Sequence, residues 1–257
     1  MTLKKNKKLL LVITAVLISL LMPACGEPWD LYETAAKKFD NAEGIIIRFS
    51  SGLTVSEGVT EAKSSFEGEM KINHGQDGYS MSLTGELVIS PDEGGRAVEV
   101  KAYYQNGRYY SQMAKSKYYT DLSWEEVLEQ VGLCTFASAL TREDFQAIST
   151  DDSGENTIVE YVISPEKAVK IYGLAGRWER FSNQGSKENV ISLREVTGKV
   201  VLDGSEPESQ SFLITGTVID GDRVRNVTNT IFNEFELYSD PVKVDIPDAS
   251  GFTELER

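Results

Sequence analysis

The stretch Val98-Glu99-Val100-Lys101-Ala102-Tyr103-Tyr104-Gln105-Asn106-Gly107-Arg108-Tyr109-Tyr110 predicts two antiparallel strands joined by a tight turn. Before the turn, Val98, Val100, Ala102 and Tyr104 alternate with other residues, which is the spacing of a strand that has one buried face. Asn106-Gly107 favours a type I′ turn, because both central residues of that turn need positive φ. The sequence therefore predicts a β-hairpin here.

The same period of two continues on both sides of this hairpin. A second hairpin is predicted at Asp220-Gly221, between a strand that contains Phe212, Ile214 and Val218 and the segment from Val224 to Tyr238. Segments of this kind read as half-buried antiparallel strands, because one side of each segment is apolar. They lie at residues 66–72, 81–89, 98–104, 157–163, 196–202, 212–218 and 224–238.

Four segments have helical signals instead. Pro28 suits a first helical turn, and the apolar residues after it keep the spacing of one helix face. Ser123 with Glu126, and Thr141 with Asp144, match capping boxes that would begin helices over 124–131 and 141–148. A fourth helix is predicted from Pro165 to Trp178. The fold class is therefore α+β: a single curved antiparallel sheet, a half-barrel, with short helices packed on its concave face.

The first 24 residues have the order of a secretory signal. Four lysines precede the uncharged run Leu9–Leu21, and Met22-Pro23-Ala24-Cys25 comes next. A cysteine at this place resembles the bacterial lipobox, in which the thiol receives a diacylglycerol before cleavage. We therefore expect residues 1–24 to be a cleaved lipoprotein signal peptide and Cys25 to be the lipidated N-terminus. Two acyl chains give stable anchoring, so the protein should sit on the extracytoplasmic face of the cell membrane. Almost no tether separates Cys25 from the first helix.

The composition limits the classes of partner. Residues 25–257 contain 22 basic and 40 acidic residues, which is a net charge of −18. This charge disfavours nucleic acid and anionic headgroups as partners, and no nucleic-acid partner is expected. Residues 25–257 are predicted to form one domain, since all-β units of this size are common. The oligomeric state and any protein partner are left open.

The residues that catalysis or a metal site would require are scarce. His74 is the only histidine, and no nucleophile-elbow sequence accompanies it. Cys134 lies in an apolar stretch and is expected to be a buried, unreactive thiol. The acidic residues Asp151, Asp152 and Glu155 fail the spacing of a calcium loop. We expect no catalytic residue, no metal and no cofactor, and the chain is predicted not to be an enzyme.

The order of these features resembles a known group of lipoproteins. The lipidated N-terminus, first helix, Tyr103–Tyr110 hairpin, short helices and final segment Val244-Asp245-Ile246-Pro247 are similar to the half-barrel lipoproteins of the LolA/LolB/LppX-like superfamily, including uncharacterised Gram-positive members. The resemblance spans most of residues 28–250. It implies a strongly curved sheet that wraps an apolar concave face, helices that partly plug this face, and a groove that can hold acyl chains.

Two functions from different classes remain after this reading. The first is a non-catalytic, membrane-anchored protein that binds a lipid or other hydrophobic ligand in the concave groove, with Tyr104, Tyr110, Trp124, Leu128 and Tyr172 as candidate lining residues. The second is an acidic structural or interaction protein of the cell envelope whose concave face is filled. An extracellular hydrolase is supported least. A continuous apolar cavity between sheet and helices would favour the first function.

Overall fold

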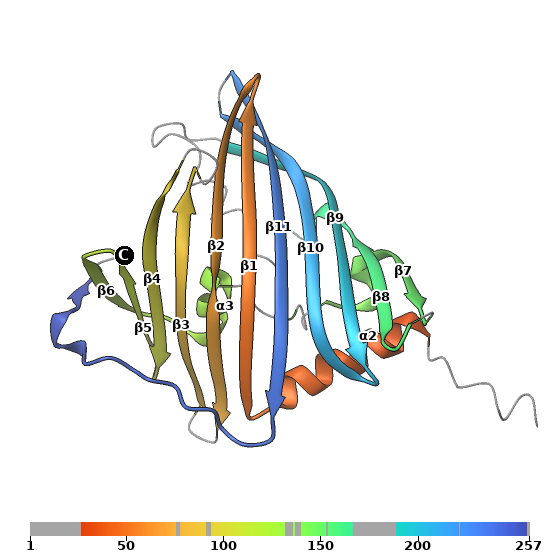
Figure 1. The fold of residues 1–257 in the computed structure, drawn as a ribbon, viewed down its shortest axis with the longest axis horizontal. Helices are drawn as coiled ribbons and strands as arrows, with labels where there is room; N and C mark the ends of the chain where they lie inside the picture. The colour runs from red at the N-terminus through yellow and green to blue at the C-terminus, as the bar shows by residue number, and fades with distance from the viewer. Residues whose placement is uncertain are drawn as a thin grey trace, which may run out of the picture.

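A single large sheet forms the body of the protein. The computed structural model describes residues 27–75, 78–90, 94–131, 136, 140–152, 154–166, 189–220 and 222–255. Twelve strands pair in the order β12-β6-β5-β4-β3-β2-β1-β11-β10-β9-β8-β7 (Figure 1). All of these pairings are antiparallel except the short one between β12 and β6. The predicted single antiparallel sheet is therefore confirmed.

The strands fall into two consecutive meanders joined at the centre of the sheet. β1 pairs with β11, so that Gly44 lies opposite Tyr238 across the join. The first meander comprises β1 (Gly44–Glu57), β2 (Thr60–Gly75), β3 (Gly78–Ile89), β4 (Arg96–Gln105), β5 (Arg108–Met113) and β6 (Ser116–Asp121). The second comprises β7 (Phe145–Asp151), β8 (Thr157–Ile163), β9 (Asn189–Asp203), β10 (Glu206–Asp220) and β11 (Arg223–Tyr238), and the two-residue β12 (Thr253–Glu254) comes last.

The register assigns the side chains to two faces of the sheet. Ile47 lies opposite Met70 on β2 and opposite Phe235 on β11, and all three side chains are buried. Arg48, the next residue along β1, is exposed beside Glu69 and Glu236 on the other side. We call the face that carries Ile47 the helix face and the face that carries Arg48 the outer face. Figure 1 is seen from the outer face, with the helices behind the sheet.

Helix α2 (Pro28–Asn41) covers part of the helix face at the lower edge of Figure 1. Its buried residues are Tyr32, Ala35, Ala36 and Phe39, the apolar face that the sequence predicted. The ring of Tyr32 contacts that of Tyr161 on β8 at 5.3 Å between centroids. This helix therefore docks by burying one apolar stripe on the sheet.

Two further local predictions are confirmed. Asn106 and Gly107 have φ of 53° and 77° between β4 and β5, as a type I′ turn requires. Helix α3 (Trp124–Val131) begins with the predicted capping box, in which the Ser123 N–H donates to Glu126 Oε2 at 2.7 Å. The Glu126 N–H donates in return to Ser123 Oγ at 3.2 Å.

The helix predicted over 141–148 is wrong. Thr141 and Asp144 do form a capping box, but it holds only the 3-10 turn η3 (Arg142–Asp144). Strand β7 begins at Phe145, because the residues from this point pair with β8 rather than presenting a helical stripe. Of the helix predicted over 165–178, only Pro165 and Glu166 are described, and both are helical. A single 3-10 turn, η4 (Ala249–Gly251), precedes β12.

Candidate ligand-binding site

The lower part of the helix face is a filled core beneath α2. Tyr32 and Phe39 of α2 meet rings from the sheet and from Phe136, with centroids 5.1–5.6 Å apart. Across β1, β2 and β3 the same face is buried at mid-height, where Ile47, Met70 and Met81 have no exposed surface. The side chains leave no free space at these positions, so a ligand site on the helix face must lie beside them.

Polar groups are set into the filled core between β8 and β11. Gln210 is fully buried and its Nε2 donates to the Tyr161 hydroxyl at 2.7 Å. Burial disfavours the charged phenolate, so the pKa of Tyr161 lies well above its usual range, although hydrogen bonds from Gln210 and Tyr32 oppose this. Among the described residues, Gln210 Oε1 and Asn229 Oδ1 have no hydrogen-bond partner. The amide groups of Gln210 and Asn229 sit in the core and line none of the cavities described below.

A cavity of about 380 Å³, the lower pocket, lies beside α3. Three rings form a stack along its wall: His74 to Tyr79 at 4.4 Å, and Tyr79 to Trp124 at 4.5 Å between centroids. The interplanar angles are 13° and 6°, so the rings are nearly parallel. The pocket is lined by Phe39, Asp40, Ala42, Ile45, Ile72, His74, Tyr79, Trp124, Glu125, Leu128 and Phe136.

A second cavity of about 490 Å³, the upper groove, lies on the helix face at the opposite end of β1. Its apolar residues are only partly covered: Leu53 and Val55 are half-buried, and Ile89 is 54% exposed. The hairpin tips nearby also carry exposed apolar residues, Val59 and Val224. The groove is lined by Leu53, Val55, Glu57, Thr60, Ala62, Lys63, Ser64, Leu87, Ile89 and Arg225.

Two phenylalanines separate the upper groove from the filled core. The rings of Phe49 on β1 and Phe66 on β2 lie 4.9 Å apart between centroids. Phe66 is directly opposite Leu87 on β3, and Phe49 lies four residues before Leu53 on β1. Each ring lies over a glycine: a Cβ at Gly68 would come within 2.8 Å of Phe49, and one at Gly85 within 2.7 Å of Phe66. The missing side chains at these two positions therefore let the rings close the floor of the groove.

The charged residues that line the upper groove are Glu57, Lys63 and Arg225. Arg225 Nε lies 3.0 Å from Glu57 Oε2, and its side chain is 12% exposed. Arg223 Nε lies 4.0 Å from the same carboxylate. The groove thus combines apolar walls with a polar rim, the arrangement of a site for an amphiphilic or apolar ligand.

No protein-family model and no curated protein matches this sequence. The chain resembles two mycobacterial proteins of known structure. LprF from Mycobacterium bovis is 9% identical over 86% of this chain and 99% of its own, with a TM-score of 0.43. The Mycobacterium tuberculosis lipoprotein LppX is 14% identical over 85% and 98%, with a TM-score of 0.39. The predicted resemblance to LppX-like lipoproteins is confirmed, but scores this low say nothing of what this chain binds.

The structure brings three of the five candidate lining residues together. Trp124 and Leu128 of α3 line the lower pocket, and the buried ring of Tyr104 lies 5.4 Å from that of Trp124. Tyr110 does not join them: it pairs with Tyr103 on the outer face, where it contacts Tyr119 and Phe252. Tyr172, like Cys25 and Cys134, lies outside the described residues.

The residues of the upper groove were missed from the sequence. Leu53 and Val55 alternate with Thr54 and Ser56 just as core residues do, so their spacing does not distinguish a covered position from an open one. The signal that could have found them is length. A strand of 14 residues spans roughly 45 Å, whereas the eight residues of α3 span about 12 Å. Helix α3 by itself is therefore too short to cover the length of such strands.

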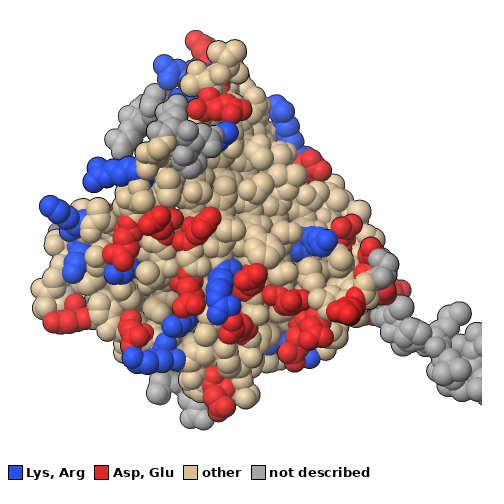
Figure 2. Space-filling model, in the orientation of Figure 1, with Lys and Arg blue, Asp and Glu red and all other residues tan. Residues whose placement is uncertain are grey.

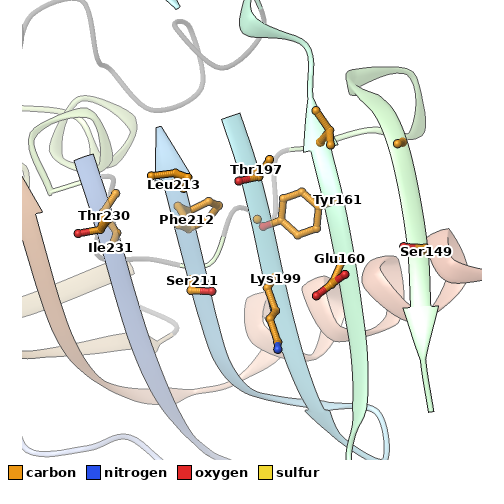
Figure 3. A pocket seen from close by; sticks show the side chains of 13 residues that line it. Ser149, Glu160, Tyr161, Thr197, Lys199, Ser211, Phe212, Leu213, Thr230 and Ile231 are labelled. Carbon is orange, nitrogen blue, oxygen red and sulfur yellow. The ribbon is translucent and has the colours of Figure 1, made fainter. Parts of the chain in front are cut away.

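A third hollow, of about 580 Å³, lies on the outer face and is shallow (Figure 3). Ser149, Thr197, Ser211 and Thr230 give it short hydroxyl walls, and Lys199 and Glu160 extend along its lower part. Figure 2 shows that charged side chains gather over the lower half of this face and leave its upper centre uncharged. An open depression without a buried polar group aimed into it does not define a ligand site.

Two kinds of feature, a metal site and a membrane-spanning helix, are absent from the described ranges. Within them, no group of three or more His, Cys, Asp or Glu side chains is placed to hold a metal ion. None of the helices in those ranges has the length and apolar character that crossing a bilayer demands. His74 lies at the end of β2, as predicted, and stacks on Tyr79.

Proposed function

We propose that this protein is a membrane-anchored, extracytoplasmic lipoprotein that binds a lipid or other hydrophobic ligand in the upper groove of a concave sheet face. The observation that carries the proposal is the upper groove itself. Its volume of about 490 Å³ falls within the roughly 300–1,000 Å³ typical of small-molecule sites. The resemblance to half-barrel lipoproteins agrees with it but is not its basis.

The physical argument concerns apolar surface left in contact with water. Burial of such surface contributes roughly 25 cal/mol per Å². A ligand that covered Leu53, Val55, Leu87 and Ile89 would therefore be stabilised by burying their apolar surface. Ile47, Met70 and Met81, lower on the same face, are already fully covered. An acyl chain laid along the groove would cover the remaining residues. The proposal includes no catalytic step, cofactor or metal.

The competing function, an envelope interaction protein, predicted a filled concave face. The face is filled around Ile47, Met70 and Met81, below the Phe49–Phe66 floor, and open above that floor. The open part favours ligand binding at the upper end. The same rim of exposed Val59 and Val224 could meet a partner, so the decisive experiment must address the groove and not the rim.

The test fills the groove with a larger side chain. Ala62 faces the groove, whereas Thr54 lies on the outer face of the adjacent strand. The neutral fluorescent probe N-phenyl-1-naphthylamine should bind the wild-type protein saturably. Ala62→Phe should weaken this binding about tenfold, and the matched control Thr54→Phe should not. Circular dichroism would verify folding. Equal binding by both variants would place the probe elsewhere and overturn the proposal.

A further inference from the structure

The lower pocket has a charge pattern that the proposed function does not use. Asp40 at the end of α2 and Glu125 at the start of α3 both line it, and both are exposed. Among its described lining residues, these carboxylates carry the only formal charges when His74 is neutral. An acidic rim with no lysine or arginine in that lining favours a cation over an anion.

The carboxylates of Asp40 and Glu125 both influence the same side chain, Tyr79. Tyr79 lies in the wall of the pocket, and its pKa is raised above the usual value, first by desolvation and then by the negative charges of Asp40 and Glu125. Asp40 and Glu125 come from two helices separated by more than eighty residues, yet both act electrostatically on one phenol. Asp40, Glu125 and Tyr79 all line this one pocket, which agrees with that shift.

The floor of the pocket is apolar. Ile45, Ile72 and Phe39 are buried beneath it, and Leu128 forms a wall on α3. A purely inorganic cation would gain nothing from this floor and would lose water to it. A ligand with an apolar body and one ammonium group would use both parts, with the body on the isoleucines and the ammonium between the carboxylates.

We propose that the lower pocket is a second binding site, specific for small organic amines in which an apolar body carries a single ammonium group. The site is independent of the upper groove, because the Phe49–Phe66 floor and the filled core separate the two cavities. The ammonium lies between Asp40 and Glu125, and the apolar body contacts Ile45, Ile72 and Leu128. Hydrophobic contact supplies affinity, and the carboxylates supply selectivity for charge.

The test uses three probes with one apolar body: 4-phenylbutylamine, 4-phenylbutanol and 4-phenylbutyrate. Isothermal titration should show the amine binding about fivefold to tenfold more tightly than the alcohol, with the carboxylate weakest. The preference should shrink at high salt, since both acids are exposed. Amide chemical shifts of His74 and Trp124 would locate the probe in the pocket.

The variants separate charge from packing. Asp40→Asn with Glu125→Gln should bring the amine down to the affinity of the alcohol and leave the alcohol unchanged. Glu33→Gln, which removes an acid paired with Lys37 on α2, should preserve the preference. An amine that binds no better than the alcohol, or a preference that survives in the double variant, would overturn the proposal. Neither result would bear on N-phenyl-1-naphthylamine binding in the upper groove.

Discussion

At the scale of single residues, Tyr161 joins three features of the core. Its ring lies against the backbone of Gly198, where a Cβ would come within 2.2 Å of the ring carbons. Its hydroxyl accepts a hydrogen bond from Gln210, and its ring contacts Tyr32 of α2. Gly198, Gln210 and helix α2 therefore all contact the Tyr161 side chain. Substitutions of Tyr161 should strongly affect the free energy of unfolding.

Tyr161→Phe should lower the free energy of unfolding by about 1–3 kcal/mol at neutral pH, because Gln210 Nε2 loses its buried acceptor. The free energy of unfolding of the variant should also depend less on pH than that of the wild type. Burial raises the pKa of Tyr161 in the folded state above the value of about 10 for an unfolded chain. The folded state then holds the proton more tightly, so stability that is complete below pH 10 is lost as the pH rises further.

Urea unfolding at pH 7, 9 and 10.5 measures both effects. The wild type should lose more stability between pH 9 and 10.5 than Tyr161→Phe does. The control is Tyr118→Phe, since Tyr118 is 41% exposed and its substitution should leave the wild-type pH dependence intact. Parallel pH profiles for wild type and Tyr161→Phe would contradict the assignment.

At the scale of elements, two capping boxes led to different structures. Ser123–Glu126 begins helix α3, whereas Thr141–Asp144 holds one 3-10 turn before a strand. A capping box fixes only the first turn, and the residues beyond it decide whether a helix continues. Trp124, Val127 and Val131 keep helical spacing after the first box. The segment after the second box pairs with β8, a partner that no local pattern reveals.

Ser123→Ala should destabilise the protein by about 1 kcal/mol, because Glu126 N–H at the start of α3 loses its side-chain acceptor. Trp124 is the next residue after Ser123 and stacks on Tyr79, so the fluorescence of Trp124 should report the loosened helix start. Glu126→Gln keeps an acceptor for the Ser123 N–H and should cost less. Thermal unfolding of the three proteins provides the comparison, and an equal loss in both variants would speak against the box.

The sequence predicted elements better than it predicted their arrangement. Strands, the Asn106-Gly107 turn and α2 depend on neighbouring residues, and all are found. The pairing of β1 with β11 joins residues almost two hundred positions apart, and its register depends on the whole sheet. Trp124 and Leu128 were predicted as lining residues because they are apolar residues on a predicted helix, and both line the lower pocket. Leu53 and Val55 have the same spacing as core residues and differ from them in being only half-buried.

At the scale of the whole molecule, the remaining question is where the protein is held. The sequence predicts that Cys25 carries lipid, and Cys25→Ser should move the protein from the membrane fraction to the soluble fraction or stall its processing. Cys134→Ser is the matched control, because it removes the other thiol and should leave the protein membrane-bound. Fractionation with immunoblotting measures both. Normal processing and unchanged membrane association of Cys25→Ser would exclude this anchor.

Helix α2 and the upper groove lie at opposite ends of β1, and this placement determines the side from which a ligand would reach the groove. Only Gly26 separates Cys25 from Glu27, a reach of about 7 Å. Helix α2 runs along the lower edge of the sheet, while the β1–β2 turn stands at the top (Figure 1). β1 itself spans roughly 45 Å. If Cys25 is acylated, the mouth of the groove opens toward the outside of the cell. A ligand of the proposed groove would then be exchanged with an acceptor beyond the bilayer. The protein would act as an outward-facing carrier that is attached to the membrane only at its base.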